Sequence, residues 1–283
     1  MLFSRGVPPA QWRDVAYCSL RQFTKDKIPA VSAGVTFYVL LALFPAISAF
    51  VSLYGLVSDV SDAAREIRSL SEILPGGALT LIGDELTRLT QTNHGALGLA
   101  FAVSFGVSIW SANAGMKALI DGLNVAYEAT ETRGFFEVTL LTLGLTVGAI
   151  LLGAAWLSLV VVAPRLVPGG AEVANWLQWP LLLVWVMLAL QILYWVGPSR
   201  RLVAWRWITS GSMAAGIAWL ATSALFSWYV ANFGHYNRTY GSLGAIVGFL
   251  TWVWLSLMVV LLGAELNREI ERRSAPCATS PAN

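Results

Sequence analysis

Charged residues along this chain are confined to short segments that alternate with long apolar stretches. Six stretches of 26 to 31 residues contain no Asp, Glu, Lys or Arg: 28–58, 89–116, 138–164, 173–199, 207–237 and 239–264. A helix needs about 20 mainly apolar residues to cross the hydrocarbon core of a bilayer. Each stretch can hold one such helix, and the pattern therefore predicts an all-α, polytopic membrane protein with six transmembrane helices.

The same pattern divides the chain into three parts. We expect a cytoplasmic N-terminal segment at 1–27, a six-helix membrane domain at 28–271 and a disordered tail at 272–283, whose residues are small, polar and rich in Pro. The first outer loop, 59–88, is the longest connection; it is predicted either to cap the helices or to bind a partner. The spans are placed at about 29–57, 94–116, 138–163, 178–198, 208–231 and 242–265.

Composition and charge support this assignment and add an orientation. Of the 283 residues, 57% are apolar and 12% are charged, about half the charge of a soluble domain. If the N-terminus is cytoplasmic, 13 of the 18 Lys and Arg residues lie in inside segments and 5 in outside segments. This bias predicts that both termini are cytoplasmic. The net charge of +2 is dispersed, so we expect no nucleic-acid partner.

The N-terminal segment contains apolar residues at helical spacing, namely Trp12, Val15, Ala16, Leu20 and Phe23. The spacing predicts a short amphipathic helix. Two positions are open for it: on the cytoplasmic leaflet, or packed against the helical bundle.

Breaks within the spans indicate kinks or close packing. Pro45 lies in the middle of the first span, where it removes a backbone hydrogen bond and favours a kink. Two G-x-x-x-G pairs, Gly144 with Gly148 and Gly244 with Gly248, are predicted to let helices approach closely. A hinge for alternating access is the other interpretation.

Polar side chains in or beside the spans are the candidates for function. Asn113 and Gln191 are expected to hydrogen-bond to neighbouring helices. Glu265 directly follows the sixth apolar stretch. It is either an interfacial acid paired with a nearby Arg or a proton- or substrate-binding group at the inner end of a path.

The connection between the fifth and sixth spans, 232–244, is short and rich in Gly and polar residues. It is either a structured turn that seals the outer end or a set of donors converging on an anionic or polyhydroxyl group, with Arg238 as its cation. The candidates there are Asn232, His235, Tyr236, Arg238, Tyr240 and Gly241.

Four segments resemble the YihY/BrkB family of bacterial inner-membrane proteins: 26–45 (beginning Asp-Lys-Ile-Pro), 123–133 (with Asn-Val-Ala-Tyr-Glu), 232–244 and 262–267 (Leu-Gly-Ala-Glu-Leu-Asn). The resemblance implies a six-helix fold in the inner membrane. It adds five residues to the candidate substrate path: Asn124, Tyr127, Glu128, Arg133 and Asn267.

Some members of that family have carried a ribonuclease BN label. A metal-dependent nuclease needs several carboxylates or histidines around its metal, but the chain has two histidines, His94 and His235, without metal-ligand spacing. We therefore expect no enzyme activity, no catalytic or metal-binding residues and no cofactor.

The favoured function is a translocator, that is, a permease, an exporter or a lipid flippase, in contact with membrane lipids. Its cargo is an unidentified small anion or lipid, and the protein is either monomeric or a homo-oligomer. The alternative is a scaffold or assembly factor for envelope proteins that transports nothing.

Overall fold

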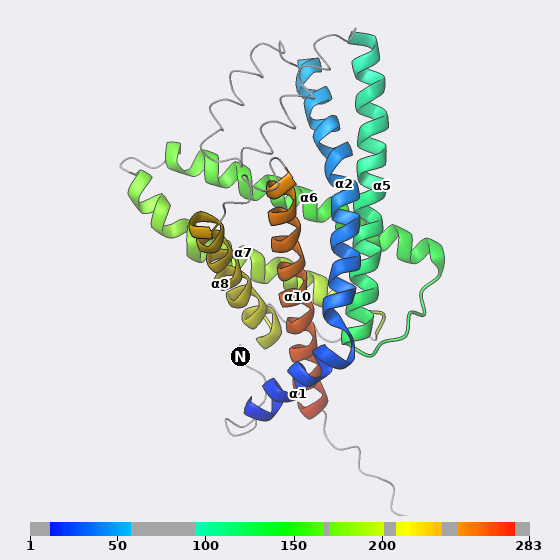
Figure 1. The fold of residues 1–283 in the computed structure, drawn as a ribbon, viewed down its shortest axis with the longest axis vertical. Coiled ribbons are helices and arrows are strands. Elements are labelled where there is room, and N and C mark those ends of the chain that lie inside the picture. The colour runs from blue at the N-terminus through cyan, green and yellow to red at the C-terminus, as the bar shows by residue number, and fades with distance from the viewer. Residues whose placement is uncertain (1–11, 58–93, 167–169, 201–207, 234–242, 275–283) are drawn as a thin grey trace, which may run out of the picture. The chain divides into compact units, whose positions relative to one another are not determined.

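The computed structural model describes residues 12–57, 94–166, 170–200, 208–233 and 243–274, and the regular structure in these ranges is helical (Figure 1). The predicted all-α class is therefore confirmed for the described residues. Their helices are α1 (Trp12–Lys25), α2 (Ile28–Val57), α5 (His94–Ala126), α6 (Phe135–Leu166), α7 (Gly170–Val196), α8 (Ser210–Phe233) and α10 (Leu243–Ser274).

Five of the described helices contain a segment long and apolar enough to cross a membrane: Ile28–Ile47, Phe135–Trp156, Leu177–Val196, Ser210–Val230 and Ile246–Arg273. The predicted second span, 94–116, lies within the 33-residue helix α5. The count of six spans and the orientation stay predictions.

The tail was predicted to begin at 272, which is wrong by a few residues because α10 continues to Ser274. The outer loop 59–88 lies outside the described residues.

The membrane-spanning helices expose apolar side chains and bury polar ones. Leu140, Leu151 and Leu225 are 73%, 63% and 66% exposed, whereas Thr142 and Gln191 are 0% and 3% exposed. Lipid tails solvate an exposed leucine but provide no hydrogen bonds, so polar groups are stable only where protein surrounds them. This distribution supports a multi-pass membrane protein.

The described chain forms two compact units. The first comprises residues 1–32, 116–223 and 256–283. Its core is built on Leu123, Leu190, Tyr194 and Leu261, and the Tyr194 hydroxyl donates a 2.6 Å hydrogen bond to the carbonyl of Val260. This bond satisfies the only polar atom of the largest fully buried side chain among the described residues.

The second unit comprises residues 33–115 and 224–255. Helix α2 runs through Pro45 without ending there. Asn113 is 9% exposed, and its side-chain oxygen has no hydrogen-bond partner among the described residues. The sequence predicts that the Asn113 amide bonds to a neighbouring helix; its oxygen makes no such bond in the part of the chain that the structure describes.

Helices α8 and α10 approach closely at Gly211 and Gly263. A Cβ atom added to Gly211 would lie 2.2 Å from the carbonyl oxygen of Gly263, so only glycine fits. The predicted close approach at Gly144 and Gly148 is wrong for the described residues, since a Cβ at either position would meet open space. Spacing alone identifies small residues but does not say which of them face another helix.

The connection between α5 and α6 is fixed by hydrogen bonds to the end of α7. The guanidinium of Arg133 donates two 2.8 Å bonds to the two carboxylate oxygens of Glu131 and a 2.7 Å bond to the carbonyl of Gly197, just beyond α7. The side chain of Asn124 donates to Glu131 at 3.0 Å and accepts from the backbone N–H of Ser199 at 2.7 Å. We call Asn124, Glu131, Arg133 and Ser199 the α5–α7 clamp.

This geometry stabilises the ionised form of Glu131. The hydrogen bonds from Arg133, more than any other cause, lower the pKa of the Glu131 carboxyl from its ordinary 4.5 to about 2. Because the pKa is lower in the folded chain, the clamp contributes stability above pH 4.5 and loses that contribution as the pH falls toward 2.

Acidification should therefore destabilise the wild-type protein partly through Glu131. In Glu131→Gln and Arg133→Gln, the fall in the midpoint of thermal unfolding between about pH 5 and pH 3 should be smaller than in wild type. The measurement is thermal unfolding of the purified protein in one detergent across this range. An unchanged pH dependence in both variants would contradict the role of the clamp.

The α8–α10 contact generates a second prediction. Gly211→Ala should destabilise the protein by about 1–3 kcal/mol or more, because the helices must separate to admit a methyl group. Gly144→Ala is the matched control, since its methyl group enters open space and helical glycine is intrinsically unfavourable. Thermal unfolding in detergent should show a lower midpoint for Gly211→Ala alone; equal midpoints would refute the contact.

Candidate functional site

Helix α1 packs one face on the last part of α10. Val15 is fully buried and contacts Ile270, with Leu266 alongside. On its other side, Tyr17 and Leu20 are 69% and 56% exposed. The predicted helix is present and packs on α10, but the buried face is not the predicted one, because Trp12 and Leu20 are exposed. Its position relative to the cytoplasmic leaflet stays a prediction.

A two-residue turn connects α1 to α2. It places Lys27 in the left-handed region, with a φ of 52°, and α2 begins at the next residue. Asp26 in this turn accepts hydrogen bonds from the Gln22 side chain at 3.0 and 3.2 Å. The last turn of α1 is thereby fixed beside the beginning of the first predicted span.

Helix α5 ends in a Schellman motif that holds Glu128 in a strained conformation. The N–H of Ala129 bonds to the carbonyl of Asn124 at 2.8 Å, and that of Glu128 bonds to the carbonyl of Val125 at 2.9 Å. Glu128 has a φ of 46°, a value that favours glycine. Its side chain accounts for the exception, because it pairs with Arg268 and accepts from Gln22 at 3.2 Å.

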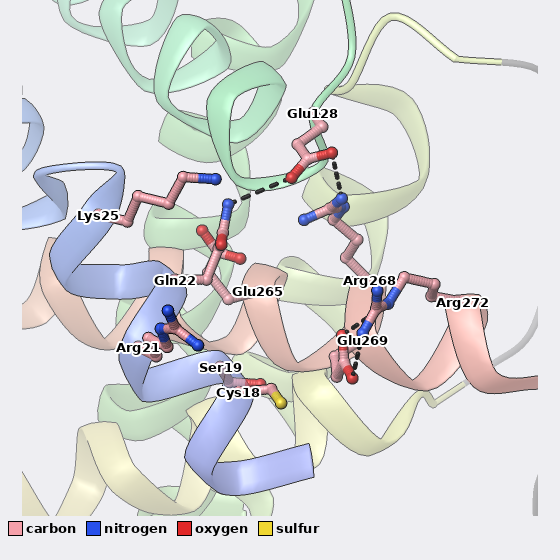
Figure 2. A pocket seen from close by; sticks show the side chains of 10 residues that line it. All are labelled: Cys18, Ser19, Arg21, Gln22, Lys25, Glu128, Glu265, Arg268, Glu269 and Arg272. Atoms are coloured by element: carbon pink, nitrogen blue, oxygen red, sulfur yellow. Dashed lines mark hydrogen bonds and ion pairs between the residues drawn. The ribbon is translucent and has the colours of Figure 1, made fainter. Parts of the chain in front are cut away.

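These three segments enclose a polar pocket of about 310 Å³ (Figure 2). Helix α1 contributes five lining residues, the end of α5 contributes one, and α10 contributes four. They are Cys18, Ser19, Arg21, Gln22, Lys25, Glu128, Glu265, Arg268, Glu269 and Arg272. All lie in the first unit, so its own packing defines the pocket.

Two acids of the pocket have basic partners. Arg268 pairs with Glu128, and Glu269 accepts hydrogen bonds from Arg272 at 3.0 Å and from Arg273 at 2.6 Å. The Arg–Glu pairs on α10 are three and four residues apart, the spacing that brings helical side chains together.

Glu265 has no such partner. It is 2% exposed, and its Oε1 atom makes no hydrogen bond to any described residue. The expected pairing with a nearby Arg is not made, because Arg268, one turn further along α10, pairs with Glu128 instead. The view in Figure 2 shows the Glu265 side chain extending from α10 toward α1. A buried carboxylate with an unsatisfied oxygen is costly, so this residue is the strongest functional candidate of the site.

Asn267, a second candidate on α10, fixes the start of α8. Its Oδ1 accepts a 2.8 Å bond from the N–H of Gly211, and its Nδ2 donates to the Thr209 hydroxyl at 3.0 Å. Thr209 in turn donates to Gln191 of α7 at 2.9 Å. The sequence predicts a bond from Gln191 to a neighbouring helix; its partner is the residue directly before α8. The geometry gives Asn267 a structural role.

Tyr127 is also enclosed by structural contacts. The Arg200 guanidinium lies 4.1 Å from the centre of its ring, in cation–π geometry, and pairs with Glu271. Burial raises the pKa of Tyr127 above its usual range, so the side chain is a neutral phenol.

The structure thus separates the predicted path residues. Glu128 and Glu265 meet at the pocket, whereas Asn124 and Arg133 belong to the α5–α7 clamp. The structure gives no support for placing these two clamp residues on a path. Asn232 is exposed and donates to the carbonyl of Trp228 at 2.8 Å. The other hairpin candidates, His235, Tyr236, Arg238, Tyr240 and Gly241, lie outside the described residues.

Sequence reasoning missed the α1 side of the pocket. Arg21, Gln22 and Lys25 were assigned no role, although Arg21 and Lys25 are four residues apart and so share one side of the helix. That spacing was the available signal. Among the described residues, no group of three or more His, Cys, Asp or Glu side chains is arranged to hold a metal ion.

Comparison with known proteins places the chain among bacterial membrane proteins. It is 28% identical over 271 residues to the putative ribonuclease-like protein YfkH of Bacillus subtilis, covering 89% of this chain and 93% of that protein. It is 31% identical over 258 residues to the UPF0761 membrane protein RSc1559 of Ralstonia nicotianae, covering 88% of this chain. It is 29% identical over 268 residues to the UPF0761 membrane protein Nmul_A0452 of Nitrosospira multiformis, covering 89% of this chain.

The chain spans 56% and 59% of the length of the two UPF0761 relatives. No solved structure matches it. The virulence factor BrkB family matches residues 19–282, nearly the whole chain. The resemblance seen in the sequence motifs is therefore confirmed, and the chain belongs to the virulence factor BrkB family of membrane proteins.

Proposed function

We propose that this protein is a translocator of the inner membrane, with a small anion or a lipid as its cargo. The observation that carries the proposal is Glu265, a buried carboxyl group with an unsatisfied oxygen at the wall of a polar pocket. Ionisable groups within membrane-spanning segments are costly and typically line ion or substrate pathways.

The basic residues indicate on which side the pocket lies. Its wall contains Arg21, Lys25, Arg268 and Arg272, all in segments that the bias of 13 to 5 assigns to the cytoplasm. In this orientation the pocket is the cytoplasmic end of the path. The predicted hairpin around Arg238 would then face the other side of the membrane.

Local ion pairing does not account for Glu265. The acids that neutralise the α10 arginines are Glu128 and Glu269, so the fold would keep these pairs if Glu265 were neutral. Glu265 keeps one carboxyl oxygen without a donor among the described residues, and a ligand or a transported ion would satisfy it. The name of YfkH describes that relative as ribonuclease-like and names no cargo.

The proposal is tested by reconstituting the full chain into lipid vesicles. Wild-type protein should accelerate movement of a fluorescent NBD-phospholipid, read by dithionite quenching, or uptake of radiolabelled phosphate. Glu265→Gln removes the charge while retaining the shape, and should reduce the rate to that of protein-free vesicles. Asp14→Asn is the matched control, because this exposed α1 acid is outside the pocket wall and its loss should leave the rate unchanged.

Two results would contradict the proposal. Absence of wild-type transport for both cargoes would favour the scaffold alternative, especially if a protein co-purifies with the chain and is lost when the acids of loop 59–88 are neutralised. Normal transport by correctly folded Glu265→Gln would exclude Glu265 from the path. Arg238→Ala tests the predicted outer end separately.

A further inference from the structure

The charges of the pocket do not all cancel. Arg268 pairs with Glu128, and Arg272 pairs with Glu269. The lining residues left without an ion pair among the described residues are one acid, Glu265, and two cations, Arg21 and Lys25. A ligand complementary to this remainder has a positive group for Glu265 and a negative group for the two α1 cations.

The environment of Glu265 selects a positive group that can donate hydrogen bonds. Its Oε1 is buried and lacks a donor, while the carboxyl of Asp26 is a second nearby acid that also interacts with the Glu265 carboxyl through a hydrogen bond. Arg268 also acts on Glu265 electrostatically, although it is bound to Glu128. A primary ammonium, with three N–H donors on a compact cation, can satisfy the free oxygen of Glu265.

The environment of Arg21 and Lys25 selects an anion with several oxygens. Both side chains are exposed at the pocket wall, and they are four residues apart on α1, where like charges repel. Gln22, on the turn between them, already donates to Asp26 and Glu128. A phosphate can accept from a guanidinium and an ammonium at once and thereby relieves the repulsion.

The size and position of the pocket restrict the ligand further. A volume of about 310 Å³ is at the lower end of the range for ligand sites, about 300–1,000 Å³, and suits a compact polar group. Helix α1 joins the membrane-spanning helix α2 through two residues and exposes Tyr17 and Leu20. A helix with exposed apolar side chains so close to a span lies at the membrane boundary, where lipid headgroups are concentrated.

We propose that the pocket between α1 and α10 binds a ligand with a primary ammonium and a phosphate, the chemistry of phosphoethanolamine. Glu265 accepts from the ammonium, and Arg21 and Lys25 bind the phosphate. Two sources carry this chemistry: the headgroup of an aminophospholipid and free phosphoethanolamine. The inference rests on the proposed function only in regarding this ligand as the cargo; binding itself is independent of transport.

Equilibrium binding to the purified full chain tests the site without any measurement of transport. The probes are short-chain phosphatidylethanolamine and phosphatidylcholine, which differ only in the three methyl groups that remove the N–H donors. Wild-type protein should bind the first about tenfold or more tightly than the second, as expected for loss of a hydrogen bond to a charged group. The two N-methylated intermediates should fall between them, and this series needs no variant.

Variants assign the two halves of the site. Glu265→Gln should reduce the preference for phosphatidylethanolamine over phosphatidylcholine to nearly one. Arg21→Gln and Lys25→Gln should weaken binding of both lipids and leave the preference intact. Asp14→Asn, on α1 but outside the pocket wall, should bind as wild type. Thermal unfolding of each variant checks that it is folded.

Equal binding of the two lipids by wild type, or a preference that survives in Glu265→Gln, would overturn the inference. Full competition by inorganic phosphate at the affinity of phosphoethanolamine would do so as well, because it would mean a site for anions alone.

Free phosphoethanolamine binding as tightly as the lipid would identify the soluble source, and weaker binding would identify the headgroup. A headgroup preference without transport would support the binding site and contradict the proposed function. Transport without a headgroup preference would support the proposed function and contradict the binding site.

Discussion

The cost of placing a polar atom in hydrocarbon is the constraint on which the rest of this structure depends. A soluble protein can leave a polar side chain in water, but a membrane-spanning helix must find it a partner within the protein. Gln191 accepts a hydrogen bond from Thr209, the Tyr194 hydroxyl donates to the carbonyl of Val260, and Arg133 donates to a carbonyl just beyond α7. Asn113 and Glu265 each keep a buried oxygen without a partner among the described residues, and Glu265 is the one of the two that can carry a charge.

The same constraint explains how much of the fold was predictable from the sequence. Removing charge from hydrocarbon leaves long apolar stretches, so the ends of α2, α6 and α8 were predicted to within three residues, whereas α7 begins eight residues before the predicted start at 178. Helix α10 extends nine residues beyond the predicted end of its span at 265 because its charged last turns pair with one another and continue the helix. The distribution of charge shows which residues lie in the hydrocarbon core, whereas the ends of a helix depend on capping and on side-chain pairing.

The site was predictable only in part, because its contacts join distant parts of the sequence. Glu265 could be identified from its position beside an apolar stretch. The sequence could not show that Arg268 pairs with Glu128 and not with Glu265. Asn124 and Arg133 were assigned to the path because they lie in a family motif, and a motif does not say what its residues do. Here they form a clamp to residues 75 and 64 positions away. The glycine pair with the favourable spacing, Gly144 and Gly148, faces open space, whereas the closely packed pair, Gly211 and Gly263, has no local signature.

The packing of α1 on α10 has a consequence for biosynthesis. These helices lie near opposite ends of the chain, and the hydrogen bond from Arg273 to the Cys18 sulfur joins residues 255 positions apart. While the chain is being synthesised, the face of α1 that carries Val15 cannot contact Ile270 until α10 has left the ribosome. The α1–α10 pocket therefore forms only after α10 has been made, more than 200 residues after α1.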